Sequence, residues 1–425
     1  MEDVRMKKTK MFFPAAIFIC LFSSMALANG LNLNSLGSRA LAMGGAFVGL
    51  ADDFSAIYWN PAGIVQFKSK YFGFYMTDII PSGTYERTEV PAFKADTESK
   101  QYLSGLAAYY YPVSDDVVAG LGVYIPSGLG AKWNGADFAP LSSDTSYLWE
   151  SKIGLITFAP ALAVKINDMI SIGAALNINY GTFNIKMHAG LTPPPDSLDL
   201  GQYEESMTGW GYGATIGVLV KPMEKLSIGA TFRTESTVKF KGEAQISNLS
   251  FLGVNDTANL KREVSWPMWI AAGAAFTPKE NLTLTADLQW TQWSKIDEIK
   301  TNYIDVGWQF IMNPIGKDKM PMYWKDTLQI RFGAEYRMNT FALRVGYYID
   351  PSPAPDSTMN VLVPSFDFNV ITAGFGYALK GLQIDFSLEY LMGKERSVGT
   401  DNKFNMPGKY NQKIIVPNIS ISYKF

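Results

Sequence analysis

The chain has 425 residues, and its 37 basic and 39 acidic side chains nearly balance, which argues against a nucleic-acid-binding surface. Charged residues make up 18% and aromatic residues 14% of the chain, whereas a soluble domain carries about 25% charged residues, so the composition indicates a surface that does not wholly face water. The only cysteine is Cys20, which excludes a disulfide framework and a cysteine-based metal site from the rest of the chain.

Residues 1–28 are typical of a cleaved secretory signal. A basic stretch at 5–10 precedes an apolar run at 11–22, and residues 26–28 (Ala-Leu-Ala) form an A-x-A cleavage site. The apolar run is too short to cross a membrane as a helix, which disfavours the alternative of an uncleaved anchor. We therefore expect the mature chain to begin at Asn29, and no apolar run of helical-span length follows it.

Residues 29–68 lack a strand pattern. Small residues dominate 37–51, and Pro61 favours extended or turn geometry at Asn60. About 40 residues of this kind are too few for a separate stable core, so we expect a small N-terminal hatch held inside a larger barrel. A charged barrel lumen would suit three side chains of this segment, Arg39, Asp52 and Asp53.

Residues 69–425 show repeated alternation of apolar and polar residues. In 382–390, for example, apolar residues alternate with Gln383, Asp385, Ser387 and Glu389. Successive side chains of a strand point to opposite faces, so each strand would have one apolar face and one polar face. Fourteen such segments are predicted, at 69–80, 100–112, 116–128, 151–166, 169–188, 206–221, 225–241, 262–277, 281–299, 326–337, 340–350, 366–379, 381–395 and 411–425.

The gaps between these segments alternate between long and short. Short gaps carry turn residues, as in 112–117, and long gaps such as 242–261 and 300–325 hold proline, glycine and polar clusters. This arrangement, with a mean hydropathy of +0.01, is typical of an all-β, antiparallel transmembrane β-barrel of the bacterial outer membrane with short periplasmic turns. A secreted β-sandwich is the alternative, but alternating loop lengths do not favour it. The terminal Phe425 resembles the insertion signal read by the barrel assembly machinery.

Three stretches of the sequence carry a family resemblance. They are GSRALAMGGAFVGLADDFSAIYWNPAG at 37–63, IPSGLGAKW at 125–133, and WKDT at 324–327 followed by LRVGYYIDPSPAPD at 343–356. With these motifs, the whole mature chain resembles the FadL/TodX family of outer-membrane transporters for long-chain fatty acids and hydrocarbons. Three residues match the hatch motif of that family, Asn60, Pro61 and Ala62.

The resemblance implies a 14-stranded barrel whose hatch blocks the lumen. It also implies that a hydrophobic substrate, foremost a long-chain fatty acid, enters an outer apolar groove, passes to an inner pocket and leaves sideways beside a kinked third strand. That strand carries Pro126, Gly128 and Gly130 here, which could kink it, although Pro126 could instead begin an outer loop. A sideways route keeps the acyl chain out of water, at roughly 0.8 kcal/mol per CH₂, and past the polar lipopolysaccharide layer.

Candidate substrate-binding residues come from strand parity and from the outer loops. Parity points the side chains of Arg233, Arg331, Arg344 and Trp269 into the lumen, where a cation beside an apolar wall could hold a carboxylate. The arginines could instead pair with lumen acids or hold the hatch. Apolar residues in the outer loops suggest a binding groove, although loops also pack on one another. These residues are Phe251, Leu252, Trp308 and Phe310.

Three other functions stay open at this point. They are a hatch-bearing adaptor for secreted proteins, an uptake channel for aromatic hydrocarbons, and a general porin, which the hatch disfavours. An enzyme is not expected, because His188 is the only histidine and no catalytic motif accompanies it. We likewise expect no cofactor and no metal site. The expected partners are a hydrophobic small molecule, outer-membrane lipid and lipopolysaccharide, and the assembly machinery.

Overall fold

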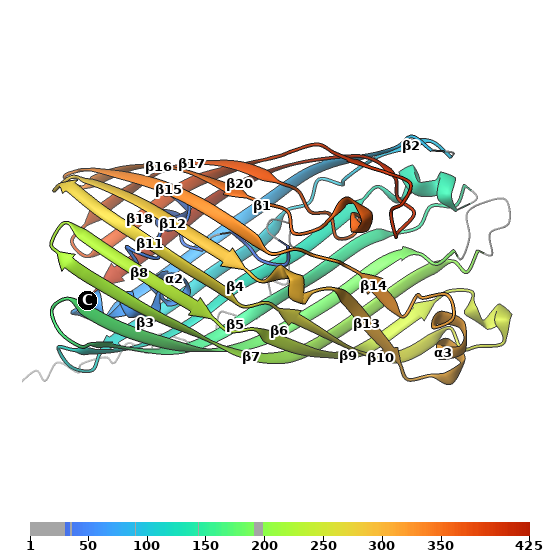
Figure 1. Ribbon diagram of the computed structural model, residues 1–425, viewed down its shortest axis with the longest axis horizontal. Coiled ribbons are helices and arrows are strands. Elements are labelled where there is room, and N and C mark those ends of the chain that lie inside the picture. The colour runs from blue at the N-terminus through green and yellow to red at the C-terminus, as the bar shows by residue number, and fades with distance from the viewer. Residues whose placement is uncertain (1–29, 35, 90, 143, 191–198) are drawn as a thin grey trace, which may run out of the picture.

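The wall of the protein is an antiparallel sheet that closes on itself. The computed structural model describes residues 30–425 except residues 35, 90, 143 and 191–198, so the expected signal peptide lies outside the described residues. Strand β1 (Tyr71–Arg87) pairs with β3 (Tyr102–Pro112) on one side and with the last strand, β20 (Gly408–Lys424), on the other. The predicted 14-strand antiparallel barrel is therefore confirmed (Figure 1).

The other strands follow around the wall in chain order, and several of the 14 crossings consist of two consecutive strands. They are β2 (Phe93–Asp96), β4 (Val117–Trp133), β5 (Trp149–Lys165), β6 (Ile170–His188), β7 (Gln202–Met223), β8 (Leu226–Arg233), β9 (Ser236–Ile246), β10 (Thr257–Trp266), β11 (Trp269–Lys279), β12 (Leu282–Thr291), β13 (Glu298–Tyr303), β14 (Lys319–Pro321), β15 (Thr327–Met338), β16 (Phe341–Asp350), β17 (Phe368–Leu379), β18 (Leu382–Gly393) and β19 (Arg396–Val398).

The two ends of the barrel differ in how the strands connect. At the end that holds the C terminus, the six expected tight turns are present, for example between β3 and β4 and between β17 and β18 (Figure 1). The opposite end carries the long connections. Among the described residues, five short helices lie in the connections that follow β4. They are η2 (Gly135–Leu141), η3 (Leu249–Leu252), η4 (Trp293–Lys295), α3 (Val306–Met312) and η5 (Asp356–Thr358). In the described part of the chain, no helix has the length and apolar character needed to cross a bilayer.

Some strands are longer than the sequence indicated. β1 continues to Arg87, beyond the expected end at residue 80. The expected long gap at 242–261 shrinks to residues 247–256, because β9 ends at Ile246 and β10 begins at Thr257. These extensions do alternate in sequence. However, their apolar residues face the opposite side of the wall from those of the neighbouring segments, so the pattern is interrupted where the sidedness changes.

The sidedness of the wall inverts along the barrel axis. Near the tight turns, apolar side chains face outwards and polar ones face inwards: in β16, Leu343 is 53% exposed and its neighbour Arg344 is 4% exposed. Toward the long connections the outer face is charged, as in β9, where Lys239 is 74% exposed and Phe240 is buried. The barrel therefore has a polar interior at one end and an apolar interior at the other.

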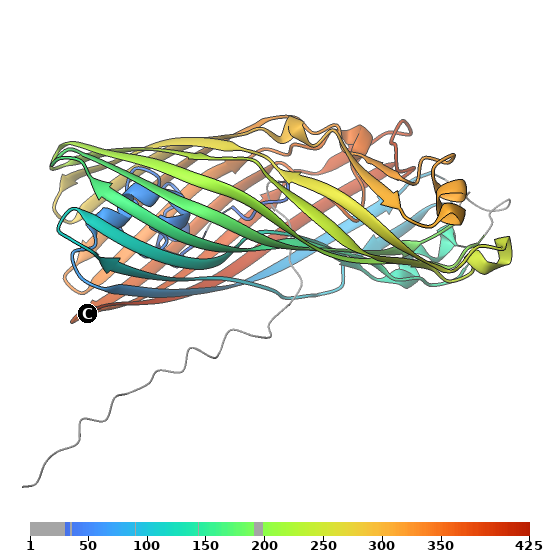
Figure 2. The same ribbon diagram turned by 90° about the horizontal axis from the view of Figure 1, so that it is seen from below.

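The N-terminal segment lies inside the barrel (Figure 1 and Figure 2). Helix α1 (Ser38–Ala42) contacts β16, β17 and β18, and η1 (Pro61–Gln66) contacts β5, β6 and β7, with α2 (Ala56–Trp59) buried between them. Inward-facing glycines of the wall allow this close approach. A Cβ atom on Gly346 of β16 would lie 2.1 Å from the backbone nitrogen of Gly44, and Gly44 itself has a φ of +66°.

Candidate binding chamber and wall opening

An apolar chamber lies inside the long-connection end of the barrel. Its volume of about 440 Å³ falls within the range of small-molecule sites. Strands and long connections both contribute to its lining. The strands do so because the inverted sidedness of the wall turns their apolar side chains inwards here. Representative apolar lining residues are Trp149, Ile185, Ile246, Met312, Leu362 and Phe404.

The chamber contains a buried ion pair whose two charges neutralise each other. Nη1 and Nη2 of Arg262 on β10 donate to the two carboxylate oxygens of Glu205 on β7, at 2.6 and 2.8 Å. The Tyr203 hydroxyl donates to the same carboxylate at 2.6 Å, and the guanidinium lies 4.5 Å from the centre of the Phe183 ring. Because Glu205 binds the guanidinium in a bidentate manner, Arg262 is already neutralised. Neither residue of this pair was predicted from the sequence to be functional.

Three lysines of the chamber lining differ from Arg262 in their ion pairing. Lys317 and Lys319 lie after α3, and Lys403 lies in the connection between β19 and β20. Within the described residues, no carboxylate lies within 4.0 Å of their amino groups. All three side chains are exposed overall, and partial desolvation of its amino group lowers the pKa of Lys317. The chamber therefore combines an apolar lining with cationic groups that could bind an anionic group.

A polar layer separates the chamber from the N-terminal segment. Asn177 and Asn179 of β6 line a small pocket of about 30 Å³ there, and their side-chain amides donate to Thr215 and Ser236 at 2.8 Å each. Arg233 lines the same pocket. Its guanidinium is sandwiched between two aromatic rings, 4.6 Å from Tyr58 and 5.0 Å from Trp269.

The structure thus brings together Arg233 and Trp269, two residues predicted to bind substrate. They lie below the chamber, near the N-terminal segment. Nη2 of Arg233 donates to the backbone carbonyl of Tyr58 at 3.1 Å, so the arginine contacts the N-terminal segment. Neither residue is among those that line the apolar chamber. Their role in substrate binding stays a prediction.

The other two predicted lumen arginines lie behind the N-terminal segment. Nη2 of Arg331 donates to the carbonyl of Asn34 at 2.9 Å. Arg344 pairs with Glu335 at 2.6 Å and with Asp385 at 2.7 Å. Both guanidinium groups therefore have partners in this structure, and they lie away from the chamber lining.

The predicted hatch residues make contacts within the segment and to the wall. The Asn60 amide donates to the carbonyls of Val48 and Val218 at 3.0 Å each, and its oxygen accepts from the Ala62 backbone N–H at 3.1 Å. Val218 belongs to β7, so Asn60 ties the segment to the barrel. Pro61, which follows it, is the first residue of η1.

Charged residues fix the other side of this segment. Arg39 bridges Glu335 of β15 at 2.7 Å and Asp52 at 2.5 Å. The second predicted acid, Asp53, accepts from the hydroxyl and the backbone N–H of Ser55 at 2.6 and 2.8 Å. Burial raises the pKa of Asp53 to about 6, although Arg39 and Ser55 oppose this shift.

The predicted outer-loop residues divide into exposed and buried ones. Phe251 and Phe310 are each 81% exposed and Leu252 is 44% exposed, whereas Trp308 is fully buried. The Trp308 indole donates to the carbonyl of Asn255 at 2.8 Å, which joins the α3 connection to the η3 connection. None of these four residues lines the chamber.

A second unpredicted cluster joins two long connections beside the chamber. His188 lies 3.0 Å from Asp199, and the Tyr147 hydroxyl donates to the same carboxylate at 2.9 Å. The rings of Tyr147 and His188 stack with centres 4.8 Å apart. The sole histidine thus takes part in a contact between connections. The sequence could not show this, because the folded paths of the connections bring Tyr147 to His188 and Asp199.

The third strand of the wall is distorted where Pro126 was expected to kink it. The register of β4 against β5 shifts between Tyr124 and Ser127, and β4 nevertheless continues to Trp133. Pro126 therefore lies within a strand and does not begin an outer loop. Gly128 and Gly130 follow within the same distorted part of β4.

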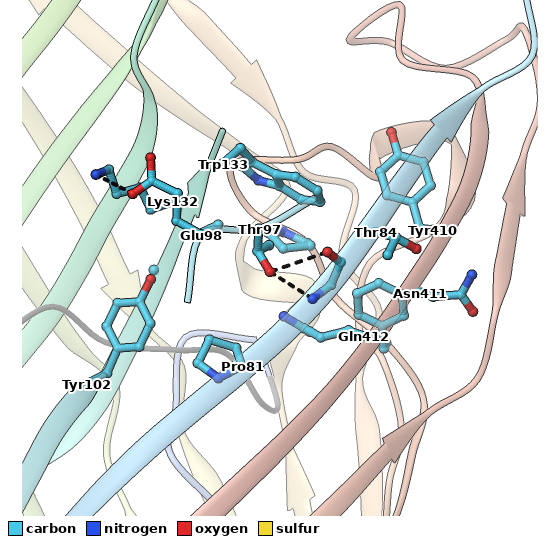
Figure 3. A pocket seen from close by; sticks show the side chains of 15 residues that line it. Pro81, Thr84, Thr97, Glu98, Tyr102, Lys132, Trp133, Tyr410, Asn411 and Gln412 are labelled. Carbon is cyan, nitrogen blue, oxygen red and sulfur yellow. Dashed lines mark hydrogen bonds and ion pairs between the residues drawn. The ribbon is translucent and has the colours of Figure 1, made fainter. Parts of the chain in front are cut away.

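The backbone pairing of the wall is interrupted on the β3 side of this distortion, at what we call the wall opening, where the Ser104 hydroxyl of β3 still donates to the carbonyl of Ile125 on β4 at 3.2 Å. Described pairing between β3 and β4 stops at Leu106 and Tyr124, although β3 remains paired with β1 as far as Tyr102. Farther along, the Glu98 backbone N–H donates to the carbonyl of Lys132 at 2.9 Å and closes the gap again. Figure 3 shows the small crevice of about 10 Å³ at this level, between Tyr102, Trp133 and Tyr410.

The N-terminal segment covers the opening from inside the barrel. Asn32 forms an isolated antiparallel bridge with Ser127, and the Leu33 backbone N–H donates to the carbonyl of Pro126 at 3.0 Å. The Ser127 hydroxyl donates to the carbonyl of Leu31, and it accepts from the Trp266 indole at 2.7 Å. The segment thus uses part of the edge that β3 leaves unpaired.

Comparison with known proteins covers nearly the whole chain. The model of a family described as outer membrane protein transport protein (OMPP1/FadL/TodX) matches residues 19–425. The chain belongs to this family. Membership places the barrel in the outer membrane. In bacterial barrels of this membrane the short turns generally lie in the periplasm and the long connections outside. Membership also makes the protein an outer membrane transport protein for hydrophobic molecules.

Individual family members are distant in sequence but similar in extent. The long-chain fatty acid transport protein of Escherichia coli is 23% identical, over 89% of this chain and 91% of that protein. Among solved structures, a Pseudomonas aeruginosa FadL homologue has a TM-score of 0.76 at 17% identity, covering 93% of this chain and 100% of that one. The Pseudomonas putida toluene transporter TodX has a TM-score of 0.73 at 16% identity, covering 93% and 99%. These structures share the fold.

Proposed function

We propose that this protein takes up long-chain fatty acids through the apolar chamber. The observation that carries the proposal is the chamber itself, in which an apolar lining meets Lys317, Lys319 and Lys403 without carboxylate partners among the described residues. A fatty acid has both features that match, an alkyl chain and a carboxylate. The relative from Escherichia coli, a long-chain fatty acid transport protein, supports the same substrate class.

The substrate leaves the barrel sideways, through the opening between β3 and β4. Below the chamber, the described part of the lumen holds the polar layer around Asn177 and the buried N-terminal segment. A route along the lumen would also end in the aqueous periplasm, where exposure of an alkyl chain to water costs roughly 0.8 kcal/mol per CH₂. The unpaired edge at Pro126 offers a shorter way to an apolar phase than the lumen does, since the outer face of the wall is in the bilayer.

In this proposal the N-terminal segment acts as a hatch with two parts. Arg39 and Asn60 hold its body in the lumen, so the body stays in place during transport. Residues 31–33 cover the wall opening through a few hydrogen bonds to Pro126 and Ser127, so displacing them uncovers it at small cost.

A reversible disulfide tests the sideways route. Asn32→Cys with Ser127→Cys places two thiols at a bridged pair, where Cβ atoms lie about 4.5–5.5 Å apart. We expect fatty acid uptake in cells to fall to background when the pair is oxidised and to recover after reduction. The control pair is Ala107→Cys with Val123→Cys, which joins β3 and β4 where they are already paired. Equal uptake in the oxidised and reduced forms of the first pair would refute the route.

The substrate class is tested separately with the chamber lysines. The triple variant Lys317→Gln, Lys319→Gln and Lys403→Gln is expected to weaken hexadecanoate binding by about tenfold or more, because a charge-assisted hydrogen bond is worth about 1.5–3 kcal/mol. Binding of the methyl ester should change little. The control is Lys300→Gln, whose amino group already pairs with Glu298 at 2.8 Å.

Aromatic hydrocarbons are the second candidate, because several solved structures with the same fold are toluene transporters. A neutral hydrocarbon would need the apolar lining and not the lysines. Toluene binding that equals hexadecanoate binding, with no effect of the triple variant, would favour this candidate. The adaptor alternative gains no support from the chamber.

A further inference from the structure

The outer surface of β9 and β10 carries a group of exposed lysines that the transport route does not use. Lys239 and Lys241 lie on β9 and Lys261 lies on β10, and all three are exposed. Their neighbours Phe240 and Leu260 are buried on the inner side of the wall. The lysines therefore point away from the chamber, into the surroundings of the barrel.

Two of these lysines face each other directly. Lys241 and Lys261 are partners in the antiparallel register of β9 and β10. Like charges at such a position lie about 4.5–5.5 Å apart at Cβ and destabilise the strand pair. In the part of the chain that the structure describes, neither amino group has a carboxylate within 4.0 Å. Glu243 and Glu263 flank them on the same face, but Glu263 already pairs with Lys239 at 3.9 Å. An anion bound between the two lysines would remove their repulsion.

The lysine pair is the centre of a longer row of polar side chains. Thr208 of β7 is the register partner of Lys241, and Asn302 of β13 is the register partner of Lys261. Both flanking side chains are exposed on the outer face. The row thus offers two ammonium groups, a hydroxyl and an amide across four neighbouring strands, all of which can donate hydrogen bonds to one anion.

The position of the row along the barrel identifies the environment of this anion. Trp210 of β7 is the register partner of Lys239, and its ring packs on Tyr180 with centres 5.0 Å apart. Below this level the outer face of β7 is apolar, with Tyr212 and Ile216 at least half exposed. Exposed aromatic residues at the edge of an apolar band mark the bilayer surface. The lysines therefore lie immediately outside the outer leaflet's acyl region.

We propose that Lys241 and Lys261 bind a phosphate group of lipopolysaccharide at its lipid A moiety. In the outer leaflet of this membrane, the phosphorylated sugars of lipid A lie at the level where the acyl chains end. Lysine is a common phosphate ligand, and basic residues at a membrane surface bind anionic lipid headgroups. The site is on the opposite side of the wall from the chamber, so it is independent of the proposed substrate.

Lipid A binding to the full-length purified protein in nanodiscs tests this site. The double variant Lys241→Gln with Lys261→Gln should bind bisphosphorylated lipid A about 20- to 30-fold more weakly, since each lysine near an anionic surface contributes about 1 kcal/mol. Heat-modified gel mobility shows that the variant barrel is folded. The matched control is Lys186→Gln with Lys300→Gln, two outward lysines that already pair with Glu204 and Glu298 at 2.6 and 2.8 Å.

Further outcomes separate the possible explanations. Dephosphorylated lipid A should bind the wild-type protein as weakly as bisphosphorylated lipid A binds the double variant. Equal weakening in the control variant, unchanged binding after phosphate removal, or equally tight binding of inorganic phosphate alone would each overturn the proposal. Hexadecanoate uptake should be the same in the double variant and the wild type, so the result does not depend on the proposed transport function.

Discussion

At the scale of single residues, the ion pair of Arg262 and Glu205 is the most consequential polar contact in the chamber. Both side chains are buried among apolar residues, at 4% and 3% exposure. Removing one member leaves a charge without a partner in a poorly hydrated place, which typically costs about 3–5 kcal/mol. We therefore expect Glu205→Ala to lower the free energy of unfolding in urea by about this amount.

The neighbouring Glu204 provides a matched control for this prediction. It faces outwards and pairs with Lys186 at 2.6 Å, with both side chains partly exposed. Exposed pairs contribute about 0–1 kcal/mol, so Glu204→Ala should change stability little. If the two variants unfold at the same urea concentration, the chamber pair contributes no more to stability than the exposed pair does.

Asn60 gives a second prediction at this scale. Its side chain joins the N-terminal segment to itself and to β7, but no strand pairing of the wall depends on it. Asn60→Ala removes about 1–3 kcal/mol from the docking of the segment. We expect fatty acid uptake to change more than the amount of folded, heat-modifiable barrel. A parallel loss of both quantities would argue that Asn60 is needed for assembly.

At the scale of elements, the long connections are joined by contacts that depend on pH. Although burial opposes it, hydrogen bonds from Gly201, Tyr147 and His188 lower the pKa of Asp199. Burial and the Asp199 carboxylate raise the pKa of Tyr147 to about 12. The contact is therefore fully formed at pH values above 3.8, the usual pKa of an aspartate. It is lost as the pH falls through the lowered pKa of Asp199. It is also lost as the pH rises toward about 12.

A tyrosine titration checks this contact. Asp199→Asn should shift the ionisation of Tyr147 to a lower pH, because the negative partner that favours the neutral hydroxyl is gone. The Tyr147→Phe variant, subtracted from each titration curve, isolates this one residue. An unchanged difference curve would show that the connections do not keep this contact in solution.

The elements themselves were largely predictable, and the exceptions have a common cause. Strands such as β16 and β18 repeat a local apolar-polar alternation that needs no knowledge of their neighbours. β9 and β10 alternate equally well, but their apolar residues face inwards, because the chamber and not the bilayer adjoins them there. The kink at Pro126 was one of two open alternatives, and only the pairing with β5 decides between them.

At the scale of the whole molecule, the inverted sidedness places the membrane on the barrel. Ile216 and Ser206 both face outwards on β7, on opposite sides of the level of Trp210. Ile216→Arg should destabilise the barrel folded in lipid vesicles by about 2–4 kcal/mol, as arginine does near the bilayer midplane, whereas Ser206→Arg should cost about 0–1 kcal/mol. The measurement is unfolding in guanidinium from vesicles. Equal costs would mean that the bilayer does not end at Trp210.

The sequence by itself determined the barrel, its strand number and its family, because alternation and turn chemistry are local properties of the chain. It also indicated that Arg233, Arg331 and Arg344 face inwards, but it did not single out Arg262. The tertiary structure decided which of them are already paired and where the chamber lies. Arg262 and Glu205 are 57 residues apart in the chain, and they meet only through the register of β7, β9 and β10. Registers depend on the packing of all strands at once, so a single chain's pattern does not reveal them.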